Sequence, residues 1–397
     1  MNRPNGHIMV LTGEPSGDVH GASLVRAMQQ QDAALTFSGI GGPCMAEAGV
    51  DLFFSIENLS AMGLTEVLFQ IRSIKKAFDS FTAHLMATRP GLLILIDYPG
   101  FNLRAARFAK NRTRTRVFYY ITPKIWAWNR SRIRQIKRFV DHAGLIFPFE
   151  EKIYKKANIP ATYVGNPLMD QYPHAVTPRA EKTAGPSDPW IIGLLPGSRK
   201  AEIHHLLDLM LTAAQMIRKY QPHTRFLVSA AGSIPLESIK KKMAFHEASG
   251  QFEIISGSPG QIFAQADMLI AASGTVTLEA ALCQIPTVII YKMSPVTFRI
   301  ARVLVKVKYA GLANIIAGRQ VMPELLQADA SPANICVTAL DMLDHLAEYR
   351  KKLTPVRLLL GSAGAAGRAA KIALDLLDAA ESGSLANRYL TNSTKPY

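Results

Sequence analysis

Two loops rich in small residues have the composition of phosphate-binding turns. The first is residues 195–199 and the second is residues 271–279, and each follows an apolar run and leads into a predicted helix. N–H groups at the start of a helix bind phosphate oxygens, and an arginine adds charge-assisted hydrogen bonds. Together the loops predict a diphosphate site made of Gly197, Ser198, Arg199, Ser273, Gly274 and Thr275. Glu279 would lie inside the second helix, where it could accept hydrogen bonds from ribose hydroxyls; an ordinary solvated helix carboxylate is the alternative.

Asp97 is the candidate general base. It ends the apolar run 91–96, which is typical of a strand buried on both faces of a parallel sheet. A carboxylate at such a strand end could take a proton from a substrate hydroxyl. A turn-forming role for Asp97 is the alternative, and Asn102 could equally be structural.

A further loop, residues 13–21, has a glycine at every fourth position. This spacing matches neither the dinucleotide-binding fingerprint nor the P-loop. It predicts a closely packed first helix that begins at Glu14, Ser16 or Asp18. Glu14 and His20 are also candidate substrate contacts.

The excess of basic residues points to an anionic partner. Lys and Arg number 45 against 30 Asp and Glu, which gives a net charge of +15. Residues 110–138 hold ten basic residues, no acidic residue and five aromatic ones, namely Phe118, Tyr119, Tyr120, Trp126 and Trp128. A surface of tryptophan and arginine suits lipid head groups, and the candidates are Trp126, Trp128, Arg130, Arg132 and Arg134. A solvated surface helix is one alternative, and binding of single-stranded nucleic acid by stacking is another, although no recognised nucleic-acid motif is present.

Composition excludes several other classes of protein. Apolar residues make up 48% and charged residues 19% of the 397, which excludes a disordered chain. The three cysteines lie far apart and no metal-binding motif is present, so we expect no disulfide framework, no metal and no cofactor. No apolar run approaches the ~18 residues of a spanning helix, and the N-terminus lacks a signal-peptide pattern. We therefore expect a cytoplasmic chain, or one bound only at the surface of a membrane.

Apolar runs alternate with helical patterns in two successive segments. Residues 1–172 contain predicted strands at 8–11, 91–97, 117–121 and 143–147. Residues 173–189, rich in proline, are the predicted linker. Residues 190–355 contain predicted strands at 190–195, 225–230, 252–255 and 268–271, and residues 356–397 form a C-terminal helix and tail. We therefore predict two α/β units, each with a parallel sheet. Ligands bind such sheets beyond the carboxyl ends of the strands.

The order of these motifs resembles that of the lipid-A-disaccharide synthase family. Members of this family are membrane-associated glycosyltransferases of the GT-B type, in which two Rossmann-like domains face each other across a cleft. The similarity spans nearly the whole chain. It rests on Gly13-Glu-x-Ser-Gly-Asp18, Gly41-Gly-Pro-x-Met45, Met62-Gly-x-x-Glu-Val-Leu68, Asp97-x-Pro-x-Phe-Asn102, Pro123-x-x-Trp-Ala-Trp128, Leu194-Leu-Pro-Gly-Ser-Arg199, Ala272-Ser-Gly-Thr275 with Glu279, and Leu312-x-Asn-x-x-Ala-Gly318.

The resemblance implies an inverting enzyme that joins UDP-2,3-diacylglucosamine to 2,3-diacylglucosamine 1-phosphate through a β-1,6 bond and releases UDP. It implies that Asp97 is the base, and that Arg199 and the amides of 273–275 stabilise the departing diphosphate without a metal. Glu279 would hold the ribose, and the remaining substrate contacts would be Glu14, Ser16, Asn102 and Asn314. The acyl chains imply an enzyme associated peripherally with the cytoplasmic face of the inner membrane.

The resemblance also leaves alternatives open. The C-terminal helices could return to the first domain, or they could be exchanged between the subunits of a homodimer. Another enzyme of the same fold that acts on UDP-N-acetylglucosamine, an epimerase or a transferase, is the alternative function. A nucleic-acid-binding protein that uses residues 110–138 is the alternative from a different class.

Overall fold

The computed structural model describes residues 6–59, 66–126, 131–172, 188–232, 234–244, 246, 252–294, 298 and 308–392. The chain forms two compact units. The first consists of residues 1–170 together with 362–397, and the second consists of residues 171–361. Most of the predicted linker, residues 173–187, lies outside the described residues.

The first unit is built on a seven-stranded parallel sheet with the strand order β3-β2-β1-β4-β5-β6-β7. The strands are β1 (His7–Leu11), β2 (Thr36–Gly41), β3 (Val50–Ser55), β4 (Leu92–Ile96), β5 (Arg116–Tyr120), β6 (His142–Leu145) and β7 (Ala161–Tyr163). The helices of this part of the chain are α1 (Pro15–Gln31), α2 (Pro43–Glu47), α3 (Glu66–Thr88), α4 (Pro99–Arg112), α5 (Arg132–Phe139), α6 (Glu150–Lys156), α7 (Leu168–Gln171) and α16 (Ala365–Asn392).

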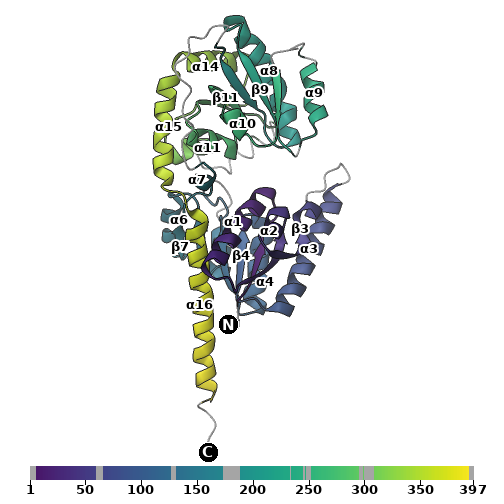
Figure 1. The fold of residues 1–397 in the computed structure, drawn as a ribbon, viewed down its shortest axis with the longest axis vertical. Coiled ribbons are helices and arrows are strands. Elements are labelled where there is room, and N and C mark those ends of the chain that lie inside the picture. Colours follow the sequence, from purple (N-terminus) through teal and green to yellow (C-terminus); the bar gives the residue numbers. More distant parts are fainter. Residues whose placement is uncertain are drawn as a thin grey trace, which may run out of the picture. The chain divides into compact units, whose positions relative to one another are not determined.

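Side chains of the central strands alternate between the two faces of this sheet, and both faces are covered. Met9 and Leu11 of β1 pack into one core with residues of α3, α4 and α5. Ile8 and Val10 of the same strand pack into a second core with residues of α1 and α16. Figure 1 shows helices along both faces of the sheet. Because neither face meets water, the central strands are apolar throughout, and this is the pattern that the sequence displays.

Helix α16 belongs to the first unit although it comes last in the sequence. It packs beside α1 and against β4 and β5 (Figure 1). Arg368 fixes its first turn, because the guanidinium donates a hydrogen bond to the carbonyl of Val164 at 2.7 Å. Ala369, Ala370, Ala373 and Leu377 of this helix are fully buried and belong to the second core, and Ala365 in its first turn is also fully buried.

The second unit is built on a six-stranded parallel sheet with the strand order β10-β9-β8-β11-β12-β13. The strands are β8 (Ile191–Leu195), β9 (Arg225–Ala230), β10 (Phe252–Ser256), β11 (Met268–Ala272), β12 (Thr287–Tyr291) and β13 (Glu324–Leu326). The helices are α8 (Lys200–Tyr220), α9 (Leu236–Ala244), α10 (Gly260–Phe263), α11 (Thr275–Leu282), α13 (Leu312–Ala317), α14 (Pro332–Asp344) and α15 (Leu346–Leu360). Ile192 and Leu194 of β8 pack into a core with residues of α8, α9 and α14.

Each sheet reverses its strand order at one place. β1 and β4 are neighbours in the first sheet, and β8 and β11 are neighbours in the second. Ligands of open parallel sheets bind at such a switch point, outside the carboxyl ends of the two strands. The loops that the sequence singles out follow these four strands. The prediction of two parallel α/β units with a helical C-terminus is confirmed.

Candidate active site

The first group of candidate residues lies at the carboxyl ends of β4 and β5. Asp97, Tyr98 and Ile121 have left-handed backbone conformations there, with φ angles of 45°, 42° and 58°. Such angles are unfavourable for residues other than glycine, and they collect at functional sites. The amide of Asp97 donates a hydrogen bond to the carbonyl of Ile121 at 3.2 Å, so the ends of the two strands are tied together.

Asn102 stabilises this turn from within the fold. Its side chain is fully buried, and its Nδ2 donates hydrogen bonds to the carbonyls of Ile96 at 3.0 Å and Asp97 at 2.8 Å. The hydroxyl of Tyr119 donates to the same Asp97 carbonyl at 2.7 Å. The predicted contact of Asn102 with a substrate is therefore corrected: its amide nitrogen binds the main chain and positions Asp97.

The pKa of the Asp97 carboxyl is raised above its ordinary value. Burial is the main cause, and the charge of Glu14 adds to it. The charges of Lys124 and Arg132, and a hydrogen bond from the backbone of Tyr98, lower the pKa. A carboxylate whose pKa is raised toward the working pH is a better general base than an ordinary exposed one.

Arg132 has a different environment from the one that the sequence predicts. The sequence assigns Arg132 to a membrane-contact surface. In the structure it is half-buried at the start of α5, and its charge acts on Asp97. Arg134, two positions later, is exposed. Arg132 thus belongs with the candidate base, and Arg134 stays a candidate for lipid contact.

Glu14 and Ser16 are exposed where α1 begins, at the carboxyl end of β1. The side chain of Glu14 forms no capping hydrogen bond with this helix. The loop is close to Tyr98, because a Cβ on Gly13 would lie 2.2 Å from Cδ1 of that ring. Glycine therefore allows the loop after β1 to approach the loop that carries Asp97.

Asp18 is a structural residue. The sequence offers it as a cap of the first helix, but its buried carboxylate accepts hydrogen bonds from the amides of Gly42, Cys44 and Met45 at 2.8, 2.9 and 3.0 Å. It therefore caps the amino end of α2, the next helix along the chain.

Trp126 is held in the fold by a buried carboxylate. Its indole N–H donates a hydrogen bond to Oε1 of Glu150 at 2.9 Å, and its ring packs edge-on against Phe147 and Phe149. Burial raises the pKa of Glu150 to about 7. Trp126 is half-buried, and its contact with lipid stays a prediction. Trp128 and Arg130 lie outside the described residues.

Other aromatic residues of the basic segment belong to the core. Phe118, Tyr119 and Tyr120 are fully buried in β5. Their rings are not available to stack on nucleobases, as the nucleic-acid hypothesis requires.

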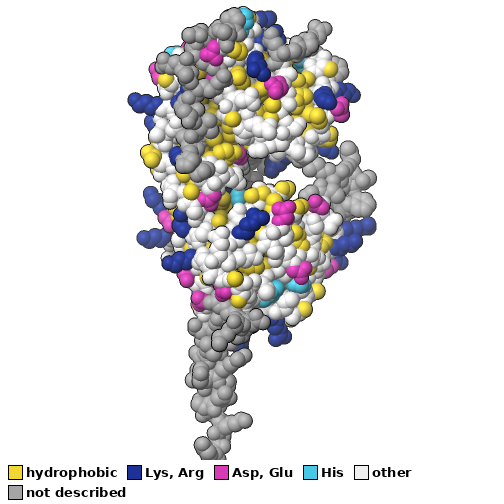
Figure 2. Space-filling view, viewed as in Figure 1, with side chains coloured by type: hydrophobic (Ala, Val, Ile, Leu, Met, Phe, Trp, Pro, Cys, Tyr) yellow, Lys and Arg dark blue, Asp and Glu magenta, His cyan; other side chains and the backbone are white. Residues whose placement is uncertain are grey.

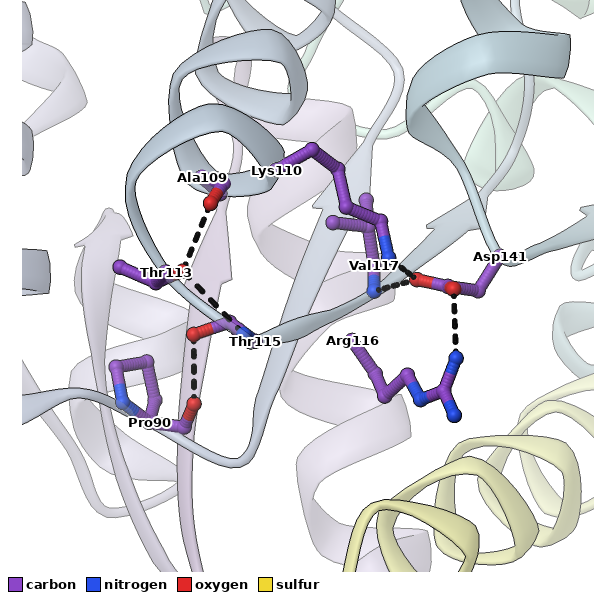
Figure 3. Close-up of polar contacts among 8 residues, drawn as sticks. All are labelled: Pro90, Ala109, Lys110, Thr113, Thr115, Arg116, Val117 and Asp141. Carbon is purple, nitrogen blue, oxygen red and sulfur yellow. Dashed lines mark hydrogen bonds and ion pairs between the residues drawn. The ribbon is translucent and has the colours of Figure 1, made fainter. Parts of the chain in front are cut away.

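Two basic residues of the same segment have a structural role at the amino end of β5. Lys110 and Arg116 both pair with Asp141, at 2.5 and 3.1 Å, and the carboxylate also accepts a hydrogen bond from the amide of Val117 at 2.7 Å (Figure 3). Asp97 lies beyond the carboxyl ends of the strands, at the opposite edge of the sheet. This charge cluster therefore stabilises the start of β5 and is separate from the candidate active site.

In the second unit, a carboxylate already occupies the amides of the loop before α8. Oε2 of Glu202 accepts hydrogen bonds from the amides of Ser198 and Arg199 at 2.9 and 3.2 Å. Gly197 has a φ angle of 109°, and a Cβ there would lie 2.2 Å from the same oxygen. The amide of Ser198 thus donates to Glu202 in this structure, and the binding of diphosphate by Gly197 and Ser198 stays a prediction. The Arg199 side chain is 77% exposed and remains a candidate cation for the diphosphate.

The amino end of α11 is more open. Its N-cap is Gly274, where a Cβ would meet nothing within 4 Å, and Thr275 beside it is exposed. The first amides of an α-helix have no partners within the helix. The amide of Ser273 donates to the carbonyl of Ile290 in the sheet, and its hydroxyl donates to the carbonyl of Ala310, both at 3.0 Å. Gly274 and Thr275 therefore stay candidates for anion binding, whereas the amide of Ser273 is hydrogen-bonded to the neighbouring strand.

Asn314 is fully buried, and its side-chain amide makes all its hydrogen bonds within the protein. Its Nδ2 donates to the carbonyl of Met322 at 2.8 Å and to Glu324 at 2.7 Å, and its Oδ1 accepts hydrogen bonds from the amides of Val321 and Met322. Glu324 in turn accepts a hydrogen bond from the amide of Ala310, the residue that Ser273 contacts. Both donors and both lone pairs of the Asn314 amide are occupied. Its predicted contact with a substrate is corrected to support of the loop before α11.

Glu279 lies in α11 and is half-buried. Its Oε2 accepts a hydrogen bond from the hydroxyl of Tyr172 at 2.9 Å. Burial raises its pKa, and the hydrogen bond from Tyr172 opposes that shift. The alternative of an ordinary solvated helix carboxylate is therefore wrong for Glu279.

Sequence reasoning missed three residues of these sites. Lys124 lies inside the motif that starts at Pro123, and Glu202 follows Arg199 at the spacing of a helix capping box, so both had a signal. Tyr172 had none, because it contacts a residue 107 positions later.

The described residues contain no helix that is long and apolar enough to cross a membrane. They also contain no group of three or more His, Cys, Asp or Glu residues that could hold a metal ion. Figure 2 shows lysine and arginine side chains scattered over the described surface on this face of the molecule, and they do not gather into one patch there.

Two parallel α/β units of this topology, each with candidate ligand-binding loops at its switch point, define the GT-B class of fold. A UDP-GlcNAc 2-epimerase from Neisseria meningitidis, solved bound to UDP-GlcNAc, aligns with a TM-score of 0.58 at 12% identity, over 94% of this chain and 99% of that one. The glycotransferase of kitacinnamycin aligns with a TM-score of 0.61 at 14% identity, over 94% and 100%. These likenesses establish the fold.

Sequence comparison identifies the family. The family profile described as lipid-A-disaccharide synthetase matches residues 8–363. A lipid-A-disaccharide synthase from Trichlorobacter lovleyi is 40% identical over 383 residues, which cover 95% of this chain and 99% of the relative. The chain belongs to the lipid-A-disaccharide synthetase family, whose members are glycosyltransferases. The resemblance drawn from the motifs is confirmed.

Proposed function

We propose that the chain is an inverting glycosyltransferase that joins UDP-2,3-diacylglucosamine to 2,3-diacylglucosamine 1-phosphate through a β-1,6 bond and releases UDP. Membership of the family supports the class of reaction. The observation that carries the assignment of roles is the position of Asp97. It is a half-buried carboxylate of raised pKa that follows a central strand at the switch point of the first sheet.

The acceptor binds to the first unit in this proposal, with its 6-hydroxyl at Asp97. The carboxylate takes the hydroxyl proton while the hydroxyl oxygen attacks the anomeric carbon of the donor. A new bond forms between that carbon and the 6-oxygen as the bond from the carbon to the diphosphate breaks. Attack from the face opposite UDP inverts the anomeric carbon. Glu14 and Ser16, exposed at the start of α1, are proposed to contact the acceptor.

The donor binds to the second unit in this proposal. Negative charge builds on the diphosphate as it leaves, and groups already in place at that point lower the barrier. The amino end of α11 at Gly274 and Thr275 supplies amides, and Arg199 supplies an exposed guanidinium. Glu279 accepts hydrogen bonds from the ribose.

We also propose that the enzyme acts at the cytoplasmic surface of the inner membrane as a peripheral protein. Both substrates carry acyl chains, and moving these chains from the bilayer into water costs about 0.8 kcal/mol per CH₂. The exposed basic residues of α5, among them Arg134 and Lys137, offer positive charge to anionic lipid.

The experiment that tests this function is mass spectrometry of the products formed from the two acylated sugars, without added metal. Wild type is compared with Asp97→Asn and Asp97→Ala. Asparagine tolerates the left-handed backbone at φ 45°, whereas alanine is strained there, so Asp97→Asn separates loss of the base from loss of the fold. We expect a tetraacyl disaccharide phosphate from wild type and a fall in turnover of about 10²- to 10⁴-fold in Asp97→Asn.

Other outcomes contradict the proposal in distinct ways. Equal turnover by wild type and Asp97→Asn would mean that another group is the base. No product from folded wild type, together with conversion of UDP-N-acetylglucosamine, would identify the epimerase or transferase alternative that the fold also supports.

A further inference from the structure

Tyr172 contacts the carboxylate that is assigned to the ribose of the donor. Its hydroxyl donates a hydrogen bond to Oε2 of Glu279 at 2.9 Å, and both side chains are half-buried. A half-buried carboxylate needs hydrogen-bond donors in place of the water it has lost. Among the residues that the structure describes, Tyr172 is the donor to this carboxylate, and it engages Oε2.

The main chain of Tyr172 is tied through Arg357 to α11, the helix that carries Glu279. Nη1 of Arg357, in α15, donates a hydrogen bond to the carbonyl of Tyr172 at 2.9 Å and lies 3.5 Å from the carbonyl of Leu282. Leu282 ends α11, the helix that carries Glu279. The Tyr172 ring also lies 6.1 Å from the ring of Phe263, centroid to centroid. Tyr172 is therefore held at both its backbone and its ring, and its hydroxyl has a defined position relative to α11.

We propose that Tyr172 is a positioning residue for nucleotide recognition: its hydroxyl holds Oε2 of Glu279, so that Oε1 accepts hydrogen bonds from the ribose hydroxyls of a uridine diphosphate. This inference rests on the ribose-binding role proposed for Glu279. Without the tyrosine hydroxyl the carboxylate is free to rotate, and the ligand must then order it.

The test compares two ligands that differ only in the ribose. UDP and 2′,3′-dideoxyuridine diphosphate are titrated into wild type and Tyr172→Phe by calorimetry, with Tyr220→Phe as the matched control. Tyr220 is 69% exposed at the end of α8, so loss of its hydroxyl should change neither affinity. We expect Tyr172→Phe to weaken UDP binding by about 3- to 10-fold and to leave the affinity of the dideoxy ligand unchanged. A purely structural defect would weaken both ligands alike and would overturn the proposal.

The pH dependence of UDP binding gives a second measure. The titratable and charged groups that face Glu279 are Tyr172 and Cys283, with Arg357 beside them. The hydrogen bond from Tyr172 lowers the pKa of Glu279, so its loss should raise that pKa further. The gap in UDP affinity between wild type and Tyr172→Phe should therefore widen as the pH falls toward the pKa of Glu279, and a gap that narrows as the pH falls would contradict the proposal.

Glu279→Ala separates this proposal from the one on which it rests. If wild type binds UDP and the dideoxy ligand equally well, and Glu279→Ala does the same, the ribose role of Glu279 fails and the role of Tyr172 fails with it. If wild type prefers UDP, Glu279→Ala loses the preference and Tyr172→Phe keeps it, the role of Glu279 stands and only that of Tyr172 is overturned.

Discussion

Oε2 of Glu202 accepts a hydrogen bond from the amide of Ser198 at 2.9 Å. This carboxylate occupies the position that an anionic ligand of the loop would take, because one amide hydrogen serves one acceptor well. The loop before α8 is thus shaped by a residue of its own helix, whereas the amino end of α11 is open at Gly274.

The Glu202→Gln variant should bind UDP at least as tightly as wild type, and up to about tenfold more tightly. The amide keeps an acceptor oxygen for Ser198 and Arg199, but it removes a negative charge that lies 3.8 Å from the Arg199 guanidinium. Weaker capping of α8 should lower the free energy of unfolding by about 1 kcal/mol. Calorimetric titration and denaturant unfolding measure the two effects. Arg199→Ala is the control, and equal weakening of UDP binding in both variants would show that Glu202 supports the ligand.

The acid limb of the pH–rate profile should move in opposite directions in two variants near Asp97. Activity rises with pH as the Asp97 carboxyl loses its proton. Glu14 raises this pKa and Lys124 lowers it, so Glu14→Gln should shift the acid limb of kcat/KM to lower pH and Lys124→Met to higher pH. Full pH profiles of the three proteins test this, and a shift of both variants in the same direction would remove Asp97 as the titrating base.

Glu150 should make the fold less stable as the pH rises. Its pKa is about 7 in the folded protein and 4.5 in the reference state, so the folded state binds its proton more tightly than the unfolded chain does. Protonated Glu150 therefore adds up to about 3 kcal/mol to the free energy of unfolding. This contribution is fully present below about pH 4.5 and is lost as the pH rises through about 7.

Denaturant unfolding from pH 4.5 to pH 8 measures this effect. Glu150→Gln carries no titrating group at this position, so the advantage of wild type over this variant should narrow as the pH rises. Glu151→Gln, at the exposed neighbouring position, is the control and should keep the wild-type dependence. A constant difference between wild type and Glu150→Gln would show that Glu150 titrates alike in both states.

Removal of two exposed basic residues of α5 should weaken binding to anionic membranes. The double variant Arg134→Ala, Lys137→Ala should lose about tenfold in affinity for phosphatidylglycerol-containing vesicles, with the loss reduced at high salt. The double variant Lys240→Ala, Lys241→Ala removes the same charge from exposed positions on the second unit. Vesicle co-sedimentation compares them, and equal losses would mean that net charge alone attracts the protein to lipid.

The sequence predicted the strands that position the site because the central strands of a parallel sheet are apolar on both faces. Strands β4 and β9 lie where the apolar runs predict them. β2 was missed because glycine and serine interrupt its sequence, yet Ser38 and Ile40 are buried. β13 was missed because it has only three residues, all half-buried.

The roles of site residues were harder to predict than their positions. A motif indicates that a residue matters, but it does not separate contact with a ligand from support of a loop. Asn102 and Asn314 both stand in matched motifs, and both are fully buried with their amides bound to neighbouring segments. Which residues contact each other depends on packing between distant segments, and the pairing of Tyr172 with Glu279 is the clearest case.

The placement of α16 has a consequence for the order in which the protein can be made. Ala369, Ala370, Ala373 and Leu377 complete the core on one face of the first sheet, yet they are synthesised after the whole second unit. While a ribosome translates residues 171–361, the first sheet already exists as a polypeptide but lacks the helix that packs against β4 and β5. The nascent chain therefore carries an exposed apolar surface on that face of the sheet until α16 has been synthesised, and during that interval it depends on chaperones or on rapid synthesis to avoid aggregation.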